Sequence, residues 1–301
     1  MIKNSLLFTG ANGFLGKNIL SLLKEKGYEI SKLDISNSDI ECNLSREIPK
    51  LKTFYDVVLH AAGKAHIVPK TEEERHVFFD VNLKGTVNLC KALEKSGIPQ
   101  VFIFISTVAV YGCENGNMIT EEHPLNGNTP YALSKIQAEQ FLLDWSKKHN
   151  VILSILRPSL IAGTNPPGNL GTMIKGIKTG LYFNINGGKA KKSVLMVQDI
   201  ANLVPLLLEK GGIYNVCDDE QLSFGQLGNL ISNQLGKKKP FSIPYFIAKG
   251  MALCGDILGK KAPINSDKLT KITQSLTFSN QKAKEILGWQ PLNVLENFRV
   301  S

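Results

Sequence analysis

Tyr131 and Lys135 lie four residues apart at the start of a segment, residues 131–149, whose pattern predicts a helix. On a helix, this spacing puts both side chains on one face. A tyrosine with an ordinary pKa near 10 is a poor base at neutral pH, but a nearby ammonium group favours the phenolate. The pair could then move a proton to or from a hydroxyl group while hydride moves at the same carbon. Because chance helices often contain this spacing, an exposed surface pair is the alternative interpretation.

Two hydroxyl residues, Ser106 and Thr107, directly follow the most apolar segment of the chain, residues 101–105. That segment predicts a buried strand. In open α/β sheets, ligands bind outside the carboxyl ends of the strands. We therefore expect Ser106 and Thr107 to face a ligand site together with Tyr131 and Lys135.

A glycine-rich motif near the N-terminus follows one predicted strand and opens a helix, which is the context that a dinucleotide-binding loop requires. Glycine permits the tight turn and a close backbone approach to a pyrophosphate, and the helix N-terminus supplies free N–H groups. A glycine-rich turn without a ligand is the alternative. The residues expected to contact the cofactor are Gly10, Asn12, Gly13, Phe14, Leu15 and Gly16.

Asp34 ends the second predicted strand, where a carboxylate can accept hydrogen bonds from the ribose hydroxyls of adenosine. The same carboxylate would repel the additional phosphate of NADP, and the nearest downstream arginine is Arg46. NAD is therefore the expected cofactor, in preference to NADP. A turn aspartate without a ligand is the alternative.

The first half of the chain alternates predicted strands and helices, which indicates a Rossmann-type, doubly wound parallel sheet of the α/β class. Residues 1–160 are expected to form the NAD-binding domain. Residues 161–301 are expected to form mainly a smaller, partly interleaved substrate domain, with segments near 194–217 returning to the first. The expected strands are residues 5–8, 28–33, 57–59, 101–105 and 151–156, and the longest expected helices are residues 72–95 and 131–149.

The composition excludes several classes of protein. Of the 301 residues, 43% are hydrophobic and 20% are charged, as in an ordinary globular protein. The net charge of +9 comes from scattered lysines without interleaved aromatic residues, so nucleic-acid binding is not expected. The five cysteines lack metal-site spacing and are expected to be buried thiols. No signal peptide or membrane span is expected, which favours the cytoplasm; residues 243–258 carry Lys249 and Asp256 and predict a packed amphipathic helix.

Taken together, the motifs TGANGFLG, HAAGK, VN, ISTVAVYG, PYALSK and LRPS, in this order, resemble the extended short-chain dehydrogenase/reductases. That family includes NAD-dependent nucleotide-sugar 4-epimerases, 4,6-dehydratases and 4-ketoreductases. The likeness covers nearly the whole chain, up to the LGWQP segment near its end. The pattern is specific for the family and much less so for the reaction.

The resemblance implies roles for individual residues. Thr107 would hydrogen-bond the reacting sugar oxygen, with Ser106 as the second candidate beside the cofactor. Tyr131 would relay the proton, and Lys135 would hold the nicotinamide ribose. Further cofactor contacts are implied for Asn43, Leu44, Ala61, Ala62, Gly63, Lys64, Asn82 and Pro158.

On the substrate side, the resemblance implies contacts from Ser159, Asn169 and Lys192. Asn169 matches an asparagine that contacts the diphosphate of the nucleotide. Lys192 stands where the family usually has arginine, and lysine binds phosphate only as a point charge. A solvated loop lysine is the alternative interpretation of Lys192.

The residues after Thr107 bear on the reaction. Family dehydratases have Asp-Glu at this point, whereas this chain has Val108 and Ala109, which cannot transfer protons. Dehydration is therefore not expected. A UDP-sugar 4-epimerase type of reaction is favoured, an NAD(P)H-dependent 4-ketoreductase is the alternative, and a non-catalytic NAD-binding regulator is a third. The family also implies a homodimer built from the helices 72–95 and 131–149. The pattern of the second helix makes Phe141 or Trp145 available to the partner, with Leu133 pointing towards the sheet. The alternative is that these side chains pack within one subunit, with Trp145 in the core.

Overall fold

The computed structural model describes residues 5–65, 67–258 and 264–300. Its centre is a seven-stranded sheet in the order β12-β7-β5-β4-β1-β2-β3, in which every neighbouring pair is parallel. The expected doubly wound α/β architecture is confirmed. The strands are β1 (Ser5–Thr9), β2 (Glu29–Asp34), β3 (Ile40–Glu41), β4 (Val57–His60), β5 (Val101–Ile105), β7 (Ile152–Pro158) and β12 (Gly212–Val216).

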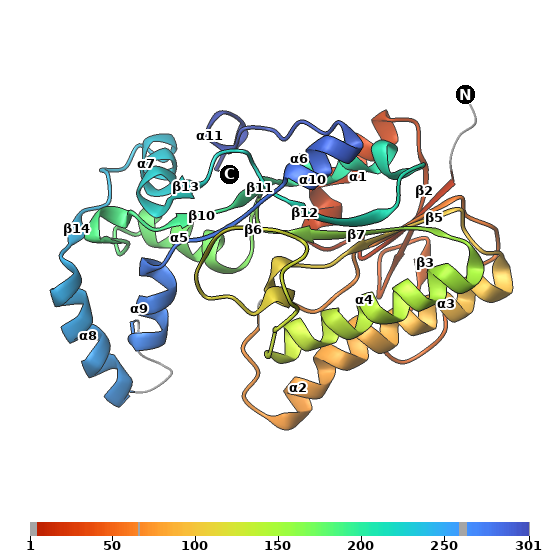
Figure 1. The fold of residues 1–301 in the computed structure, drawn as a ribbon, viewed down its shortest axis with the longest axis horizontal. Coiled ribbons are helices and arrows are strands. Elements are labelled where there is room, and N and C mark those ends of the chain that lie inside the picture. Colours follow the sequence, from red (N-terminus) through yellow and green to blue (C-terminus); the bar gives the residue numbers. More distant parts are fainter. Residues whose placement is uncertain (1–4, 66, 259–263, 301) are drawn as a thin grey trace.

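Helices cover both faces of this sheet, and each face has its own apolar core (Figure 1). On one face lie α1 (Phe14–Glu25), α6 (Val197–Leu203) and α10 (Gln281–Leu287). On the other lie α3 (Gly85–Ser96) and α4 (Pro130–His149), with α2 (Glu72–Phe79) beside α4. The central strands read as continuous apolar runs because both of their faces are buried; every residue of β5 is buried.

The expected helix 72–95 contains an interruption. A π-helical turn, Asp80–Lys84, separates α2 from α3. Such turns occur often at functional sites, and this one carries the buried Asn82. Periodicity predicted the helical stretch but not the additional residue in this turn.

Two expectations for the helix 131–149 are wrong. Trp145 is buried, packs edge-on against Phe102 with ring centroids 5.8 Å apart, and donates a hydrogen bond to Glu94 over 2.9 Å. It therefore belongs to the core of one subunit and is not available to a partner. Leu133, expected to face the sheet, is 38% exposed. Helical spacing alone did not reveal which of several apolar stripes meets the sheet.

The remaining elements form an outer lobe beside the carboxyl ends of the main strands (Figure 1). It contains a four-stranded sheet in the order β13-β10-β15-β6, and two strand pairs, β11-β8 and β14-β9. Its strands are β6 (Gly116–Ile119), β8 (Leu160–Ala162), β9 (Asn184–Ile185), β10 (Lys191–Lys192), β11 (Val194–Met196), β13 (Leu222–Ser223), β14 (Ser242–Ile243) and β15 (Leu276–Phe278). Its helices are α5 (Gly168–Lys178), α7 (Phe224–Gln234), α8 (Tyr245–Leu258), α9 (Ser266–Thr273) and α11 (Val294–Asn297).

Helix α8 confirms the expected helix in residues 243–258, but not its packing. Phe246 and Ile257 are 73% and 88% exposed. Within the described residues, no helix has the length and apolarity needed to cross a membrane. The expectation of buried thiols also fails in part: Cys42, Cys90 and Cys217 are buried, Cys113 is half-buried, and Cys254 on α8 is exposed.

Two adjacent leucines of α4 test the packing of this helix against the sheet. Leu142 is fully buried, whereas Leu143 is 39% exposed. We expect Leu142→Ala to lower the free energy of unfolding by about 2–5 kcal/mol, because it leaves a cavity in the core. Leu143→Ala is the matched control and should change it by about 0.5 kcal/mol or less. Urea unfolding measures both; equal losses would contradict this orientation of α4.

Candidate active site

The start of α4 fixes the position of Tyr131. Thr129 caps the helix by accepting a hydrogen bond from the N–H of Ala132, and Pro130 occupies the first helical turn, where its missing N–H costs nothing. Tyr131 therefore lies in the first turn of the helix. Lys135 follows one turn later on the same face, as its spacing predicted.

Lys135 is buried and fastens α4 to the end of β5. Its ammonium group donates a hydrogen bond to the carbonyl of Ile105 over 2.8 Å and lies 4.4 Å from the centre of the Phe104 ring. Burial lowers the pKa of Lys135 to about 8, and the nearby Glu139 carboxylate opposes this shift. At neutral pH the amine is therefore mainly a cation, one helical turn from the Tyr131 phenol.

Thr107 is the hydroxyl residue that meets Tyr131. It stands at the start of a 3₁₀ turn, Val108–Tyr111, and accepts a hydrogen bond from the N–H of Ala109 over 3.1 Å. Burial raises the pKa of the Tyr131 phenol, and a hydrogen bond with the Thr107 side chain opposes that shift. The structure thus brings the three expected catalytic residues, Thr107, Tyr131 and Lys135, together at the carboxyl end of β5.

Ser106 is oriented differently from Thr107. It is 3% exposed, and its hydroxyl donates to the carboxylate of Glu139, which lies one turn beyond Lys135 on α4. Its hydroxyl is therefore engaged in a buried network behind the Tyr131 site. Of the two hydroxyl residues considered from the sequence, Thr107 is the one whose side chain lowers the pKa of Tyr131, whereas Ser106 donates to Glu139.

The buried network behind Ser106 was not expected from the sequence. Glu139 forms an ion pair with Arg157 over 2.6 Å, and both side chains are almost completely inaccessible. Arg157 also donates to the Tyr111 hydroxyl over 3.0 Å, and Tyr111 donates to Asn215 over 2.7 Å. One sequence signal could have found Glu139: it continues the four-residue spacing of Tyr131 and Lys135, so it must share their face of the helix.

The glycine loop has the close packing that only glycine allows. Gly10 has a φ of +73°, and a Cβ there would lie 2.7 Å from the backbone nitrogen of Ala62. A Cβ on Gly16 would lie 2.1 Å from the carbonyl oxygen of Ala11. Gly13 precedes α1, and none of the described side chains caps this end of the helix. The first N–H groups of α1 therefore remain for an anionic ligand, as expected for a pyrophosphate.

Asp34 lies beside this loop at the end of β2. Its carboxylate accepts hydrogen bonds from the N–H of Asn12 over 2.9 Å and from the N–H of Ile35 over 2.8 Å. The Asn12 side chain in turn donates to the carbonyl of Ser36 over 2.5 Å. These bonds orient the carboxylate, and each oxygen keeps a lone pair for a ribose hydroxyl.

The segment Ala61–Lys64 forms the other wall of the groove, and Asn82 holds it. Asn82 accepts from the N–H of Lys64 over 2.7 Å and donates to the carbonyl of Lys64 and to the hydroxyl of Ser134. Gly63 faces the amine of Lys135, because a Cβ there would lie 3.4 Å from that nitrogen. The π-helical turn thereby connects the groove to α4.

Asn43 and Leu44 have roles within the protein. The side-chain oxygen of Asn43 accepts hydrogen bonds from the N–H and hydroxyl of Ser45, over 3.1 and 2.7 Å. The carbonyl of Leu44 accepts from Asn88 over 2.7 Å. The acceptor group of Asn43 is therefore engaged within its own loop, which leaves its amide nitrogen as the group that could meet an adenine.

The expected substrate residues lie on separate elements. Pro158 ends β7, and the buried hydroxyl of Ser159 has no hydrogen-bond partner among the described residues. Asn169 is exposed in the first turn of α5. Lys192 is half-buried on β10, and burial lowers its pKa. No hydrogen bond or ion pair between described residues connects Asn169 or Lys192 to Tyr131, so these residues could meet only around a ligand.

The buried His60 makes the stability of the folded protein depend on pH. It is fully buried at the end of β4, where its ring nitrogens lie 2.6 Å from the Thr9 hydroxyl and 2.9 Å from the Thr86 hydroxyl. Burial, and secondarily the charge of Lys135, lowers the pKa of His60 to about 3. The unfolded chain has an ordinary histidine pKa near 6.5, so below that pH the unfolded state binds the additional proton and the native state loses stability.

We therefore expect His60 to reduce the free energy of unfolding by about 2 kcal/mol between pH 7 and pH 5. His60→Gln should remove this part of the pH dependence, whatever its effect on stability at pH 7. His76→Gln, at an exposed position of α2, is the control and should leave the pH dependence unchanged. Urea unfolding at both pH values measures it; the same pH dependence in His60→Gln and the unmodified protein would contradict the buried, neutral state.

Comparison with known proteins places these features in a family. The chain is 30% identical over 302 residues to the N-acetyl-alpha-D-glucosaminyl-diphospho-ditrans,octacis-undecaprenol 4-epimerase of Escherichia coli O157:H7, covering 93% of this chain and 89% of that protein. The fold of this chain is similar to that of a UDP-glucose 4-epimerase with UDP-glucose from Thermotoga maritima. The TM-score is 0.74, and the identity is 21% over 97% of this chain and 95% of that chain.

The fold is also similar to that of RMD from Pseudomonas aeruginosa complexed with NADPH, with a TM-score of 0.73 and 22% identity over 98% of this chain and 96% of that chain. The model of the NAD dependent epimerase/dehydratase family matches residues 6–217, a region that runs from β1 to the end of β12 and includes the glycine loop, Thr107, Tyr131 and Lys135. The chain therefore belongs to the NAD dependent epimerase/dehydratase family.

Proposed function

We propose that this protein is an NAD-dependent 4-epimerase that acts on a nucleotide-linked sugar of the UDP-sugar type. The observation that carries the proposal is the arrangement of Thr107, Tyr131 and Lys135 at the carboxyl end of β5. A hydroxyl that orients an oxygen, a phenol that exchanges its proton and a cation that stabilises the phenolate are what redox chemistry at a carbinol carbon requires.

The residues present fit the dinucleotide. The uncapped N-terminus of α1 and the close packing at Gly10 leave room and N–H groups for the pyrophosphate. Asp34 would bind the adenosine ribose, and Lys135 and the segment Ala61–Lys64 would hold the nicotinamide half. When bound, NAD supplies the acceptor and the donor of hydride.

The protein residues divide the proton transfer between them. Thr107 holds the 4-oxygen of the sugar, and Tyr131 takes the proton of the 4-hydroxyl and later returns it. The positive charge of Lys135, one helical turn away, would favour the phenolate during this exchange. For epimerisation, the 4-keto sugar must rotate within the site, so that hydride returns to its other face.

Dehydration is disfavoured by the 3₁₀ turn that follows Thr107. Val108 and Ala109 occupy its first two positions, and neither side chain can donate or accept a proton. The non-catalytic regulator is disfavoured as well, because the Tyr131–Lys135 pair is complete and Lys135 is fastened to β5.

A 4-ketoreductase is the second candidate, because Thr107, Tyr131 and Lys135 would serve it equally well. The chemistry is then only the second half of the epimerase reaction, with NADH or NADPH exchanging at each turnover. The fold similarity to a protein complexed with NADPH is compatible with this candidate.

The two candidates differ in their need for added reductant. We would incubate the protein with a panel of UDP-, dTDP- and GDP-linked sugars, with and without NADH, and separate the products by chromatography coupled to mass spectrometry. Conversion of a sugar to an isomer of unchanged mass without added NADH supports the epimerase. Formation of a product two mass units heavier from a 4-keto sugar, only with added NADH or NADPH, would replace it with the reductase.

The homodimer remains a prediction. If α2, α3 and α4 form its interface, the contacts must come from exposed side chains such as Leu133 and Leu143. Trp145 cannot contribute, because it packs in the core.

Asp34 determines the expected preference for NAD. We expect the unmodified protein to bind NADH more tightly than NADPH, because the carboxylate repels the additional phosphate of NADPH. Asp34→Ala should narrow this difference, while Asp144→Ala, an exposed carboxylate on α4, should not change it. Isothermal titration calorimetry measures both affinities; tighter binding of NADPH by the unmodified protein would contradict the assignment.

Tyr131 carries the proton in the proposed mechanism. Tyr131→Phe keeps the aromatic ring but removes the transferable proton, so kcat should fall about 10²–10⁴-fold. The affinity for NADH should change little. Tyr28→Phe, a buried tyrosine on the opposite side of the sheet, is the control. Steady-state kinetics on a verified substrate tests this; normal turnover by Tyr131→Phe would assign the proton to another residue.

A further inference from the structure

Helix α8 forms the outer end of the lobe, and among its residues 245–257 the buried ones are all small. Ala248 and Ala252 are fully buried and form an apolar cluster with Leu269 of α9, and Gly255 is buried on the same side. Figure 1 shows α8 and α9 side by side at the end of the molecule far from α1 and β2. The inner face of α8 is thus already occupied.

The opposite face of α8 carries large apolar side chains that are mostly exposed. With 100° between successive residues, Phe246, Leu253 and Ile257 lie directly opposite Ala248 and Gly255. Their exposed fractions are 73%, 56% and 88%. Large apolar side chains that gather on one exposed face mark an interaction site rather than ordinary surface.

Two segments of the outer lobe are rich in lysine. Residues 163–198 and 221–255 contain nine lysines and no aspartate or glutamate, so they account for the whole formal net charge of +9. None of the nine forms an ion pair with a described residue. These two segments of the outer lobe are therefore basic, and an acidic residue directly follows each of them in the sequence, Asp199 and Asp256.

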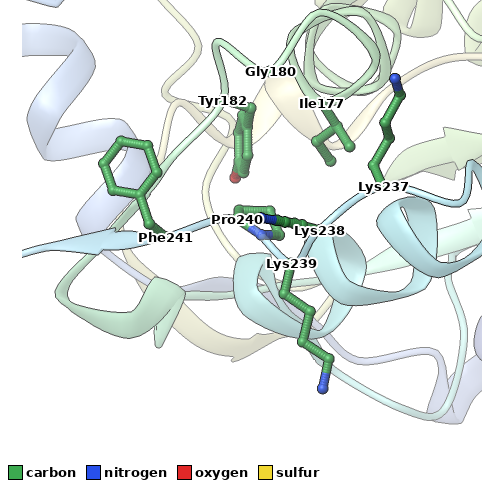
Figure 2. Close-up of a pocket in the computed structure, with 8 residues that line it drawn as sticks. All are labelled: Ile177, Gly180, Tyr182, Lys237, Lys238, Lys239, Pro240 and Phe241. Atoms are coloured by element: carbon green, nitrogen blue, oxygen red, sulfur yellow. The ribbon is translucent and has the colours of Figure 1, made fainter.

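Three of these lysines border a surface cavity of about 280 Å³ between α5 and the segment that leads from α7 to β14. Figure 2 shows Lys237 and Lys239 extending in different directions, with Phe241 pointing away from both. Because these ammonium groups do not converge, they suit attraction to an extended anionic surface better than capture of one phosphate. Phe241 is 61% exposed and lies four residues before the start of α8.

We propose that the outer face of α8, together with Phe241 and the lysines 237–239, is a docking surface for an anionic lipid bilayer. An apolar helix face flanked by lysines is the arrangement that binds membranes at the interface. With 14 residues, α8 is too short to span a bilayer, which needs about 20. The helix would lie in the headgroup region with Phe246, Leu253 and Ile257 inserted.

The charge argues against a second copy of this chain as the occupant. Two identical surfaces of this kind would bring their lysines together, and the one carboxylate of α8, Asp256, already accepts hydrogen bonds from Ser266. A bilayer rich in anionic lipid offers both an apolar interior for the helix face and negative charge for the lysines. A protein partner embedded in the membrane is an outcome that the test separates.

The inference is independent of the proposed reaction, since it rests on α8 and its surroundings rather than on Tyr131. Membrane binding would, however, affect which substrates the enzyme meets, because an enzyme on a bilayer could reach a sugar diphosphate that is anchored to a lipid. Failure of membrane binding would leave the proposed chemistry at C4 intact, and failure of that chemistry would leave membrane binding intact.

The test is co-sedimentation of the full chain with sucrose-loaded vesicles of phosphatidylcholine alone or with 30% phosphatidylglycerol. We expect binding to the anionic vesicles at least about tenfold stronger than to the neutral ones, and weaker at high salt. The variant Phe246→Ser/Leu253→Ser/Ile257→Ser and the variant Lys237→Glu/Lys238→Glu/Lys239→Glu should each reduce binding at least about tenfold.

Matched controls distinguish binding through this surface from nonspecific binding of the protein to vesicles. Ile286→Ser changes an exposed apolar residue on α10, and Lys147→Glu/Lys148→Glu changes exposed lysines at the end of α4. Both controls should bind anionic vesicles like the unmodified protein. All variants should keep their unfolding midpoint and their affinity for NADH, which shows that they are folded.

Cys254 provides a second, independent readout. It is the exposed cysteine of the described residues and lies on α8 beside the apolar face. An environment-sensitive fluorophore attached to it should shift to shorter wavelength with anionic vesicles and stay unchanged with neutral ones.

Three results would overturn the proposal. The first is equal binding of the α8 variant and the unmodified protein to vesicles. The second is the absence of both sedimentation and a spectral shift, which would assign α8 to a protein partner. The third is a dimer in sedimentation equilibrium that the α8 variant converts to a monomer, which would assign α8 to a second copy.

Discussion

The hydrogen bond from the Lys135 amine to the carbonyl of Ile105 is the contact on which the site depends. A buried ammonium group is stable only with an acceptor close to it, and this one lies at the last residue of the central strand β5. The bond therefore fixes both the distance and the rotation of α4 against the sheet. Tyr131, one turn before Lys135, is placed beside Thr107 as a consequence, and Glu139, one turn after it, is placed beside Ser106.

The ion pair of Glu139 and Arg157 holds the same face of this helix one turn further along. Removing one partner of a buried ion pair leaves the other charge without compensation and typically costs about 3–5 kcal/mol. Arg157 continues through Tyr111 to Asn215, so the network joins α4 to the strands β7 and β12. The chain uses its buried charges to make the geometry of the site rigid, while Tyr131 and Thr107 remain available to a substrate.

Much of the fold could be predicted because apolar runs and glycine spacing report directly on buried strands and tight turns. The strands around β5, the loop at Gly10 and the pair Tyr131–Lys135 all follow from such local rules. The orientation of individual side chains could not be predicted, because it depends on which face of a helix packs against the sheet. Trp145 is buried and Leu133 exposed because the tilt of α4 on the sheet decides between neighbouring stripes of one helix. The engagement of Asn43 with Ser45, and the outward face of α8, likewise depend on tertiary packing that spacing does not encode.

The proposed chemistry assigns hydride transfer to a single carbon of the sugar, with Tyr131 and Thr107 acting on its oxygen. The hydrogen at this carbon can be followed with a substrate that carries deuterium at C4 of the sugar, incubated in ordinary water without added NADH. Analysis of the product by nuclear magnetic resonance is the most direct measurement. The account predicts that the 4-epimer keeps its deuterium at C4, because the same hydride leaves and returns. An epimer that has lost the deuterium to solvent, or epimerisation at another carbon, would contradict it.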